Sequence, residues 1–528
     1  MHDTLLQRTG FFLLAAVLVL AILAAGCTQP QPQPAAVQTT PVAAMDSSSS
    51  AAPVVQTDAG EISGIATDSM RVFHNIPYAA PPAGDLRWRA PAAVQPWTGV
   101  RDGSEFSASC PQKVTQDPKT VKPVISEDCL YLNVWTPARN NSEKLPVMVF
   151  FHGGAYGITA PSGSLDYYNG SSLADQGVVV VTVNYRLGAF GFLAHPELAA
   201  ESSHNTSGNY GIMDQQAALR WVQKNIGAFG GDPAKVTIFG QSAGGTSTLI
   251  HLVSPESKGL FSQAITESGP FWQHGFAIDN AVTRAEGEQQ GTDFAAGIGY
   301  SGPGTIAQMR QADMMVLVNA TPWSPSPWVL MDTPHFQPVI DGYILPDSVD
   351  NLFHDHRQYP VPYMIGTTAD DGITVSGRPE LSVQQYEARV RDKFGKDADR
   401  ILAEYPATNP DEVRTQLVRL KTRYDFANSA KTAAASMAKI QPATYLYRYS
   451  YNLPGQANGA FHGSENVMLF GLPDGSDPAV HQNITGYWAQ FAKTGNPNGN
   501  NRADWLAFTS ETGWYMDINS ISVAKTGY

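Results

Sequence analysis

Blocks of hydrophobic residues, separated by polar and glycine-rich segments, run through the middle of the chain. Residues 145–151 are apolar throughout, and residues 236–239 form a second short run of β-prone residues. Such runs are typical of strands buried on both faces of a sheet. A helix-compatible segment follows residue 245. The alternation of strand-like and helix-like segments from about residue 146 to 252 predicts one parallel sheet covered by helices.

The same kind of pattern continues towards the C-terminus. Residues 361–366 are a short apolar strand candidate that ends in a polar turn, and residues 444–450 are also strand-like. Residues 484–491 form an aromatic amphipathic segment. The two strand candidates are followed by turns in which candidate functional residues stand.

A G-x-S-x-G sequence at residues 240–244 connects the strand at 236–239 to the following helix. In a nucleophile elbow, the serine stands on a tight strand-to-helix turn, so its neighbours must be small and its hydroxyl is exposed above the sheet. The motif alone also occurs in loops that merely turn the chain. The strand and helix flanks favour catalysis, with Ser242 as the nucleophile and the Ala243 amide facing the bond to be cleaved.

Chain order narrows the partners of Ser242. In α/β-hydrolases the acid and then the histidine follow the serine. Two adjacent carboxylates, Asp370 and Asp371, follow the next strand candidate, and beyond them only His462 and His481 remain. His462 comes after a strand and a turn, whereas His481 precedes the aromatic segment and is typical of a helix start or a packing position. The spacing favours His462 as the base.

A glycine-rich turn at residues 152–157 follows the strand predicted at 145–151. Backbone N–H groups of such an H-G-G turn can converge on a developing negative oxygen. The plain alternative is a loop that needs glycine only for its backbone geometry. Its place one βαβ unit before the elbow favours the oxyanion-hole interpretation.

Ordered motifs along most of the chain resemble the type-B carboxylesterase family, which includes the cholinesterases and several lipases. The resemblance runs from about residue 57 to the C-terminus and is more specific than any single motif. It implies an α/β-hydrolase fold with a central, mostly parallel sheet flanked by helices, and large insertions that shape the pocket. The motifs that carry it are residues 73–79, 81–88, 127–135, 184–192, 208–214, 229–233 and 487–498.

The resemblance implies a catalytic triad and an oxyanion hole built from backbone amides. Ser242 matches the nucleophile and His462 the base. The acid position, usually glutamate in this family, holds Asp371. Because aspartate is one methylene shorter, the loop or the imidazole must shift, and the adjacent Asp370 remains an alternative acid. The matching oxyanion donors are Gly154, Ala155 and Ala243.

Three further positions follow from the resemblance. Gln241 stands where cholinesterases carry glutamate, which argues against specialised choline-ester chemistry. Cys110 and Cys129 match the family's first disulfide. Closing such a loop contributes about 3 kcal/mol on the chain-entropy estimate. The alternative, two free buried thiols, would require a reducing compartment.

Composition excludes several kinds of partner. The chain has 34 basic and 47 acidic residues, a formal net charge of −13, and no basic cluster, which argues against nucleic acid. No Cys/His spacing indicates zinc, and no phosphate-binding G-x-x-x-x-G-K-S/T sequence occurs. His354 and His356 flank Asp355 in a polar segment that is typical of solvated surface. We therefore expect no metal and no organic cofactor, and the family resemblance implies a small-molecule ester as substrate.

The start of the chain predicts export. Residues 11–25 are fifteen consecutive apolar residues, the length of a signal-peptide core and too short to span a bilayer comfortably. The end of this run, from Leu23 to Cys27, resembles a bacterial lipobox. It predicts a signal peptide at 1–26 and lipid on Cys27, anchoring the protein to a bacterial membrane on its periplasmic or cell-surface side. The alternative is an ordinary signal peptide cleaved near residue 25 or 26 and a fully secreted protein with an odd thiol.

Residues 27–54 are rich in proline, glutamine, serine and small residues and carry one charge, Asp46. Such a segment cannot bury an apolar face, so it predicts a disordered tether. The catalytic domain is then residues 55–528. Within it, the proline- and tryptophan-rich residues 321–330 lie where insertions shape hydrolase pockets. They form either an aromatic pocket wall or a proline-stiffened surface loop.

Three classes of function follow from these observations. The first is a serine carboxylic-ester hydrolase that acts through an acyl-enzyme. The second is a lipase, or a specialised hydrolase of xenobiotic or carbamate esters, with the same chemistry. The third is a non-catalytic binding protein on the same fold, a class that typically lacks the serine or the histidine. The presence of both Ser242 and His462 in matching context favours an enzyme.

Overall fold

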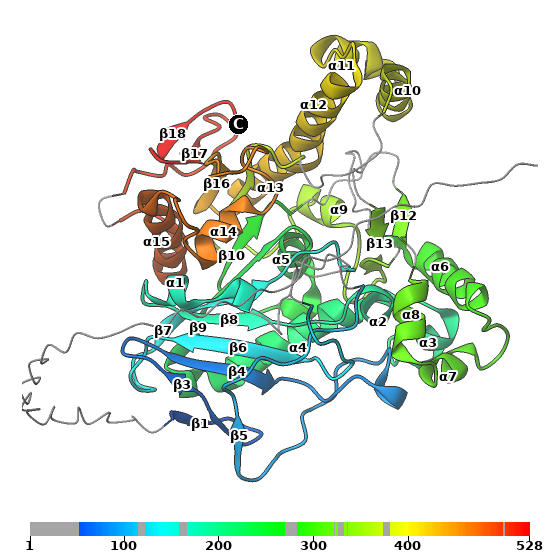
Figure 1. The fold of residues 1–528 in the computed structure, drawn as a ribbon, viewed down its shortest axis with the longest axis vertical. Helices are drawn as coiled ribbons and strands as arrows, with labels where there is room; N and C mark the ends of the chain where they lie inside the picture. Colours follow the sequence, from blue (N-terminus) through cyan, green and yellow to red (C-terminus); the bar gives the residue numbers. More distant parts are fainter. Residues whose placement is uncertain are drawn as a thin grey trace, which may run out of the picture. The chain divides into compact units, whose positions relative to one another are not determined.

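The central feature of the fold is a large mixed sheet with helices on both faces (Figure 1). The computed structural model describes residues 52–113, 122–157, 166–269, 282–321, 323–325, 332–334, 336–372, 381–499 and 502–528. In this part of the chain the sheet has eleven strands. In order across the sheet they are β18 (Val523–Lys525), β17 (Tyr515–Ile518), β16 (Thr444–Tyr449), β15 (Tyr363–Thr368), β10 (Gln263–Glu267), β9 (Gly231–Gln241), β7 (Leu145–Phe151), β8 (Val179–Val183), β6 (Tyr131–Thr136), β4 (Arg71–Pro77) and β3 (Ile65–Ala66).

The middle of this sheet is parallel and its edges are antiparallel. Every neighbouring pair from β8 across to β17 is parallel. On one side β6, β4 and β3 run antiparallel to their neighbours, and on the other side β18 does so. The predicted mostly parallel sheet of an α/β-hydrolase fold is therefore confirmed, with antiparallel strands added at both edges.

The register of the parallel strands brings their carboxyl ends together. Phe151 at the end of β7 pairs with Gly240 of β9, and Gln241 pairs with Glu267 at the end of β10. Glu267 in turn pairs with Gly366 of β15. In open α/β sheets, ligands bind outside the carboxyl ends of the strands. The turns that follow β7, β9 and β15 consequently meet at one edge.

Burial on both faces explains the apolar runs in the sequence. Along β7, Val147, Val149 and Phe151 belong to one hydrophobic cluster, whereas Met148 and Phe150 belong to another. This follows from the alternation of side chains along a strand. Helices α4 (Tyr210–Asn225), α5 (Ala243–Val253) and α13 (Asn428–Ala438) contribute to the first cluster, and α1 (Ser171–Ala174), α14 (Ser464–Phe470) and α15 (Pro478–Thr494) to the second.

A group of helices near residue 400 has a small core of its own. Helices α10 (Val383–Phe394), α11 (Ala398–Glu404) and α12 (Pro410–Lys421), drawn in yellow in Figure 1, bury a separate cluster that includes Tyr386 and Leu420. Helix α12 continues through a π-helical segment, η6 (Thr422–Ala427), into α13. Such π-helical turns are frequent at functional sites, and η6 contributes a contact to the site described below.

The remaining elements connect these layers, and most of them are short. The helical ones are η1 (Gly84–Leu86), η2 (Asp166–Tyr168), α2 (Gly188–Phe192), α3 (Pro196–Glu201), η3 (Ile226–Phe229), η4 (Pro255–Ser257), α6 (Arg284–Gly297), α7 (Thr305–Arg310), α8 (Met314–Ala320), α9 (Val349–His354) and η5 (Gly395–Asp397). The strands are β1 (Val54–Gln56), β2 (Glu61–Ser63) and β5 (Val100–Asp102) in one sheet, β11 (Val282–Thr283) with β14 (Val339–Ile340), and β12 (Trp323–Pro325) with β13 (Asp332–Pro334).

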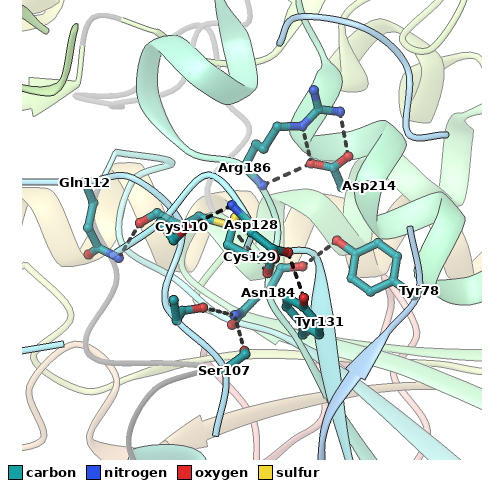
Figure 2. The surroundings of a disulfide bond; sticks show 12 residues. Tyr78, Ser107, Cys110, Gln112, Asp128, Cys129, Tyr131, Asn184, Arg186 and Asp214 are labelled. Atoms are coloured by element: carbon teal, nitrogen blue, oxygen red, sulfur yellow. Dashed lines mark hydrogen bonds and ion pairs between the residues drawn. A yellow bond between two sulfur atoms is a disulfide. The ribbon is translucent and has the colours of Figure 1, made fainter. Parts of the chain in front are cut away.

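Cys110 and Cys129 form the disulfide that the family resemblance implies, with an S–S distance of 2.02 Å (Figure 2). The chain around it is fixed by hydrogen bonds to the main chain. The Asn184 amide donates to the Ala108 carbonyl at 3.1 Å, and the Tyr78 hydroxyl donates to the Asn184 carbonyl at 2.6 Å. The disulfide thus closes a loop in the segment that precedes β6.

Several sequence predictions concern residues outside the described ranges. The signal peptide at 1–26, the acylated Cys27 and most of the tether at 27–54 lie there, and all three stay predictions. Most of the tryptophan-rich segment at 321–330 lies there as well. Residues from Ala51 to Tyr528 form one compact unit, and the domain boundary near residue 55 stays a prediction. Over the described ranges, every helix is too short or too polar to cross a membrane.

Candidate active site

Ser242 occupies a tight turn between strand β9 and helix α5. Its backbone has φ 59° and ψ −123°, a conformation rarely adopted by residues with a side chain. Such strain clusters at functional sites, where the surrounding fold holds it in place. The glycines around the serine are required by space: a methyl group at Gly244 would lie 1.8 Å from the Phe151 carbonyl oxygen. The G-x-S-x-G sequence therefore forms a true strand–turn–helix elbow.

The loop after β15 brings a carboxylate to His462. The Asp371 Oδ1 atom lies 2.7 Å from His462 Nδ1. Asp371 is fully buried, and its Oδ2 accepts hydrogen bonds from the Ser268 hydroxyl at 2.8 Å and the Thr368 amide at 3.0 Å. These two donors fix the carboxylate, so that the shorter aspartate still reaches the imidazole. The buried Asp371 carboxylate thus meets the partly exposed His462 imidazole.

Asp370, the neighbouring alternative, has a different contact. Its carboxylate accepts a hydrogen bond from the Ala460 amide at 3.0 Å, and its own amide donates to the Ala460 carbonyl at 3.0 Å. Asp370 therefore clamps the acid loop to the segment that precedes His462. Among the described residues, the carboxylate that contacts the imidazole is that of Asp371.

The second nitrogen of the imidazole, Nε2, also has a neighbour. The side-chain amide nitrogen of Gln241 lies 3.1 Å from His462 Nε2, and the Phe426 ring from η6 lies 5.0 Å from the imidazole ring. In the described part of the chain, no hydrogen bond joins the Ser242 hydroxyl to His462. Ser242 and the base therefore lie in one site, with Gln241 contacting the nitrogen that would receive the serine proton.

The turn after β7 lies against the elbow. Gly154, Ala155 and Tyr156 have φ values of 110°, 51° and 61°, an unusual run of left-handed backbone. Ala243 is the first residue of α5, and amides in the first turn of a helix have no intrahelical acceptor. Together, the residues predicted as oxyanion donors occupy two neighbouring segments whose backbone is available for an anion.

His152 holds this turn in place and is not a candidate for acid–base chemistry. The Tyr185 hydroxyl donates to the His152 carbonyl at 2.6 Å, and the two rings stack at 4.3 Å. Burial lowers the pKa of His152 to about 4, so its ring is neutral near pH 7.

Two buried glutamates beside the acid were missed by the sequence analysis. Glu465 is fully buried 3.5 Å from the Ser268 hydroxyl, and its pKa is raised well above the usual range by burial and then by the nearby charges of Asp371 and Glu267. Burial also raises the pKa of Glu267 to about 8, although the Trp488 indole donates a hydrogen bond to it at 2.6 Å. The available signal was their position: Glu267 ends the short strand β10, and Glu465 follows the candidate base by three residues.

The other candidate histidines have structural contacts. His481 lies in α15, and its Nδ1 contacts the Met468 carbonyl at 2.6 Å, in keeping with a packing role. The His354 ring is exposed beside Asp355, and His356 Nδ1 contacts the Ser436 hydroxyl at 3.1 Å. Within the described ranges, no group of three or more His, Cys, Asp or Glu side chains is arranged to hold a metal ion.

Comparison with known proteins places these features in a family. Residues 51–527 match the carboxylesterase family. Fumonisin B1 esterase from Sphingopyxis macrogoltabida is 36% identical over 473 residues, covering 86% of this chain and 84% of that protein. Para-nitrobenzyl esterase from Bacillus subtilis strain 168 is 33% identical over 483 residues, covering 87% of this chain and 93% of that protein.

A solved structure of PNB esterase superimposes with a TM-score of 0.77 at 33% identity, covering 89% of this chain and 97% of that one. Sequence and fold thus agree over nearly the whole described unit. The protein is a carboxylic-ester hydrolase with the α/β-hydrolase fold, and the chain belongs to the carboxylesterase family.

Proposed function

We propose that the protein hydrolyses carboxylic esters by two-step acyl transfer, with Ser242 as nucleophile, His462 as general base and acid, and Asp371 as the orienting carboxylate. The observation that carries the proposal is the 2.7 Å contact between Asp371 Oδ1 and His462 Nδ1, next to the elbow serine. A buried carboxylate on Nδ1 keeps the proton on that nitrogen and leaves Nε2 as the basic one.

In the first step, Ser242 Oγ attacks the carbonyl carbon of the ester while His462 Nε2 takes the serine proton. The carbonyl π bond opens, and the resulting oxyanion accepts hydrogen bonds from the amides of Gly154, Ala155 and Ala243. Each well-placed donor of this kind contributes about 10²–10³ in kcat. When the oxyanion collapses, the bond to the alcohol breaks and His462 donates its proton to the leaving alcohol oxygen.

In the second step, a water molecule takes the place of the alcohol. His462 Nε2 removes a proton from the water as it attacks the acyl carbon, and the same oxyanion donors stabilise the second tetrahedral intermediate. Collapse returns the proton to Ser242 Oγ and releases the carboxylic acid. Asp371 stabilises the imidazolium that forms in both steps, through the contact at Nδ1.

The substrate class that fits is a small-molecule carboxylic ester. Two relatives carry the names fumonisin B1 esterase and para-nitrobenzyl esterase, which supports hydrolysis of organic esters. A series of p-nitrophenyl esters of increasing acyl length distinguishes this proposal from a lipase. We expect kcat/KM to be highest for short acyl chains, and a continuous rise towards long chains would indicate a lipase instead.

Replacing Ser242 by alanine tests the proposed nucleophile. We expect Ser242→Ala to lower kcat for p-nitrophenyl acetate by at least about 10⁴ with the fold intact, as in other serine hydrolases. A fluorophosphonate should add one label to the wild type, on Ser242, and none to the variant. The control is Ser262→Ala, because Ser262 lies at the other end of the sheet and its hydroxyl donates to the Val236 carbonyl at 3.2 Å. Full activity in a folded Ser242→Ala protein would exclude the proposal.

A further inference from the structure

The side chain of Gln241 is held in a defined place between two glycines. Gln241 is the last residue of β9 and is only 7% exposed. A methyl group added to Gly153 would come within 3.0 Å of its Oε1, and one added to Gly463 within 3.3 Å of its Nε2. The amide thus fits a slot between the turn after β7 and the segment that carries His462.

The hydrogen bonds of the imidazole fix the direction of the Gln241 contact. His462 Nδ1 lies 2.7 Å from Asp371 Oδ1, and a carboxylate only accepts, so Nδ1 carries the proton. In the neutral ring Nε2 is then the acceptor. The nitrogen of the Gln241 amide, 3.1 Å away, therefore donates to the Nε2 lone pair. That lone pair is the one that the Ser242 proton needs in the proposed reaction.

We propose that Gln241 is a positioning residue that caps the basic nitrogen of His462 in the resting enzyme, so that acyl transfer requires its amide to release Nε2 to Ser242. The inference rests on the proposed function, because it gives meaning to the Ser242–His462 proton transfer. An amide at this position stabilises the neutral imidazole, whereas a carboxylate at the same position would accept from, and stabilise, the imidazolium.

The other groups around the imidazole do not provide this effect. Asp371 acts on Nδ1, and the Phe426 ring has no proton to exchange. The buried carboxyl groups of Glu465 and Glu267 lie near Asp371, and within the described ranges neither forms a hydrogen bond with the imidazole. Among the described residues, Gln241 is the side chain that contacts Nε2.

Two variants of matched size separate the amide donor from the space that it fills. Gln241→Met keeps the length of the side chain and removes the N–H donor. Gln241→Glu keeps the shape and replaces the donor by an acceptor. The measurements are the rate of Ser242 labelling by a fluorophosphonate at pH 7.5 and the pH profile of kcat/KM for p-nitrophenyl acetate, with folding checked by circular dichroism.

For Gln241→Met we expect labelling to be about three- to tenfold faster, the size of one hydrogen bond, because Nε2 is no longer capped. The acidic limb of the kcat/KM profile should move to higher pH by about half a unit to one unit, because the neutral ring has lost a donor. For Gln241→Glu the limb should move further in the same direction. The order of the limbs, wild type lowest and Gln241→Glu highest, is the signature.

Unchanged or slower labelling of Gln241→Met, or an acidic limb that stays in place or moves to lower pH, would overturn the inference. If Gln241→Met does not fold, Gln241→Glu decides alone, because an unmoved or lowered limb in that variant has the same meaning. Loss of the proposed function looks different: Ser242→Ala would remain active, or the fluorophosphonate would label another residue in the wild type.

Discussion

Asp214 and Asp371 are both fully buried carboxylates, and their surroundings are opposite. Asp214 faces Arg186: its Oδ1 accepts from Nη2 at 2.7 Å, and its Oδ2 accepts from Nε at 2.7 Å and from the Arg186 amide at 3.0 Å (Figure 2). Asp371 lies with Glu267 and Glu465, and in the described part of the chain no lysine or arginine forms a salt bridge with any of the three. One region pairs its buried carboxylate with a cation, and the other gathers three carboxyl groups without one among the described residues.

The two arrangements have different consequences for the free energy of folding. In the Arg186–Asp214 pair the remaining donors are also satisfied, since Arg186 Nη1 donates to the Arg89 carbonyl at 2.9 Å. A pair of this kind fixes the chain. Glu267 and Glu465 are buried without a cation among the described residues, and burial raises the pKa of both, which costs stability near neutral pH. Perturbed groups of this kind are typical of functional sites. Burial with a cation therefore indicates structure here, and burial among other carboxyl groups indicates chemistry.

The largest effect is expected from changing the carboxylate at the site. Asp371→Asn removes the acceptor that holds His462 in its productive tautomer, so kcat should fall by about 10³–10⁴ while the fold is retained. Asp370→Asn is the matched control, because the hydrogen bonds of Asp370 among the described residues are with the backbone of Ala460. Steady-state rates with p-nitrophenyl acetate measure both. A larger loss in Asp370→Asn would place the acid one residue earlier.

The sequence analysis could not choose between these two aspartates on physical grounds. Both follow the same strand, and the choice depends on how the loop bends after Thr368. The bend is set by contacts with distant segments: Ser268, on the loop after β10, holds Asp371, and Ala460 holds Asp370. Such contacts join residues about a hundred positions apart, which local pattern does not encode.

The same reason explains which other parts of the site were predicted. The elbow at Ser242 and the turn at residues 152–157 are local, because a strand, a tight turn and glycines that leave no room for a side chain are all visible in consecutive residues. Glu267 and Glu465 come together only through the folding of β10 and α14 against each other. The capped state of His462 depends on one side-chain rotamer of Gln241, a position known from the sequence only as a departure from cholinesterases.

The second-largest effect is expected when the Arg186–Asp214 pair is broken, and it should lower stability without lowering kcat. Asp214→Asn leaves the Arg186 guanidinium, itself 2% exposed, without a counter-charge. Removing one partner of a buried pair costs about 3–5 kcal/mol, so urea unfolding should show a loss of this size. The folded fraction should keep a kcat close to that of the wild type. Glu256→Gln, which breaks the exposed pair with Arg220, is the control and should cost at most about 1 kcal/mol. A kcat reduced a hundredfold in fully folded Asp214→Asn would contradict the contrast between the two regions.

The smallest effect is expected in the pH dependence of the free energy of unfolding, and it grows gradually as pH rises. The pKa of Glu267 is raised to about 8 by burial, so the folded state keeps this carboxyl protonated at pH values where the unfolded chain releases the proton. Its contribution to stability is therefore complete below the ordinary glutamate pKa and is lost as pH rises towards 8, by up to about 1.4 kcal/mol per pH unit. Glu267→Gln is neutral at every pH and keeps an oxygen for the Trp488 indole, which donates at 2.6 Å in the wild type. The free energy of unfolding of this variant, measured in urea from pH 5 to 8, should gain on the wild type as pH rises. Parallel curves for the two proteins would mean that Glu267 is ionised in the folded state. Protonation of this carboxyl would then not contribute to the stability of the region around Asp371.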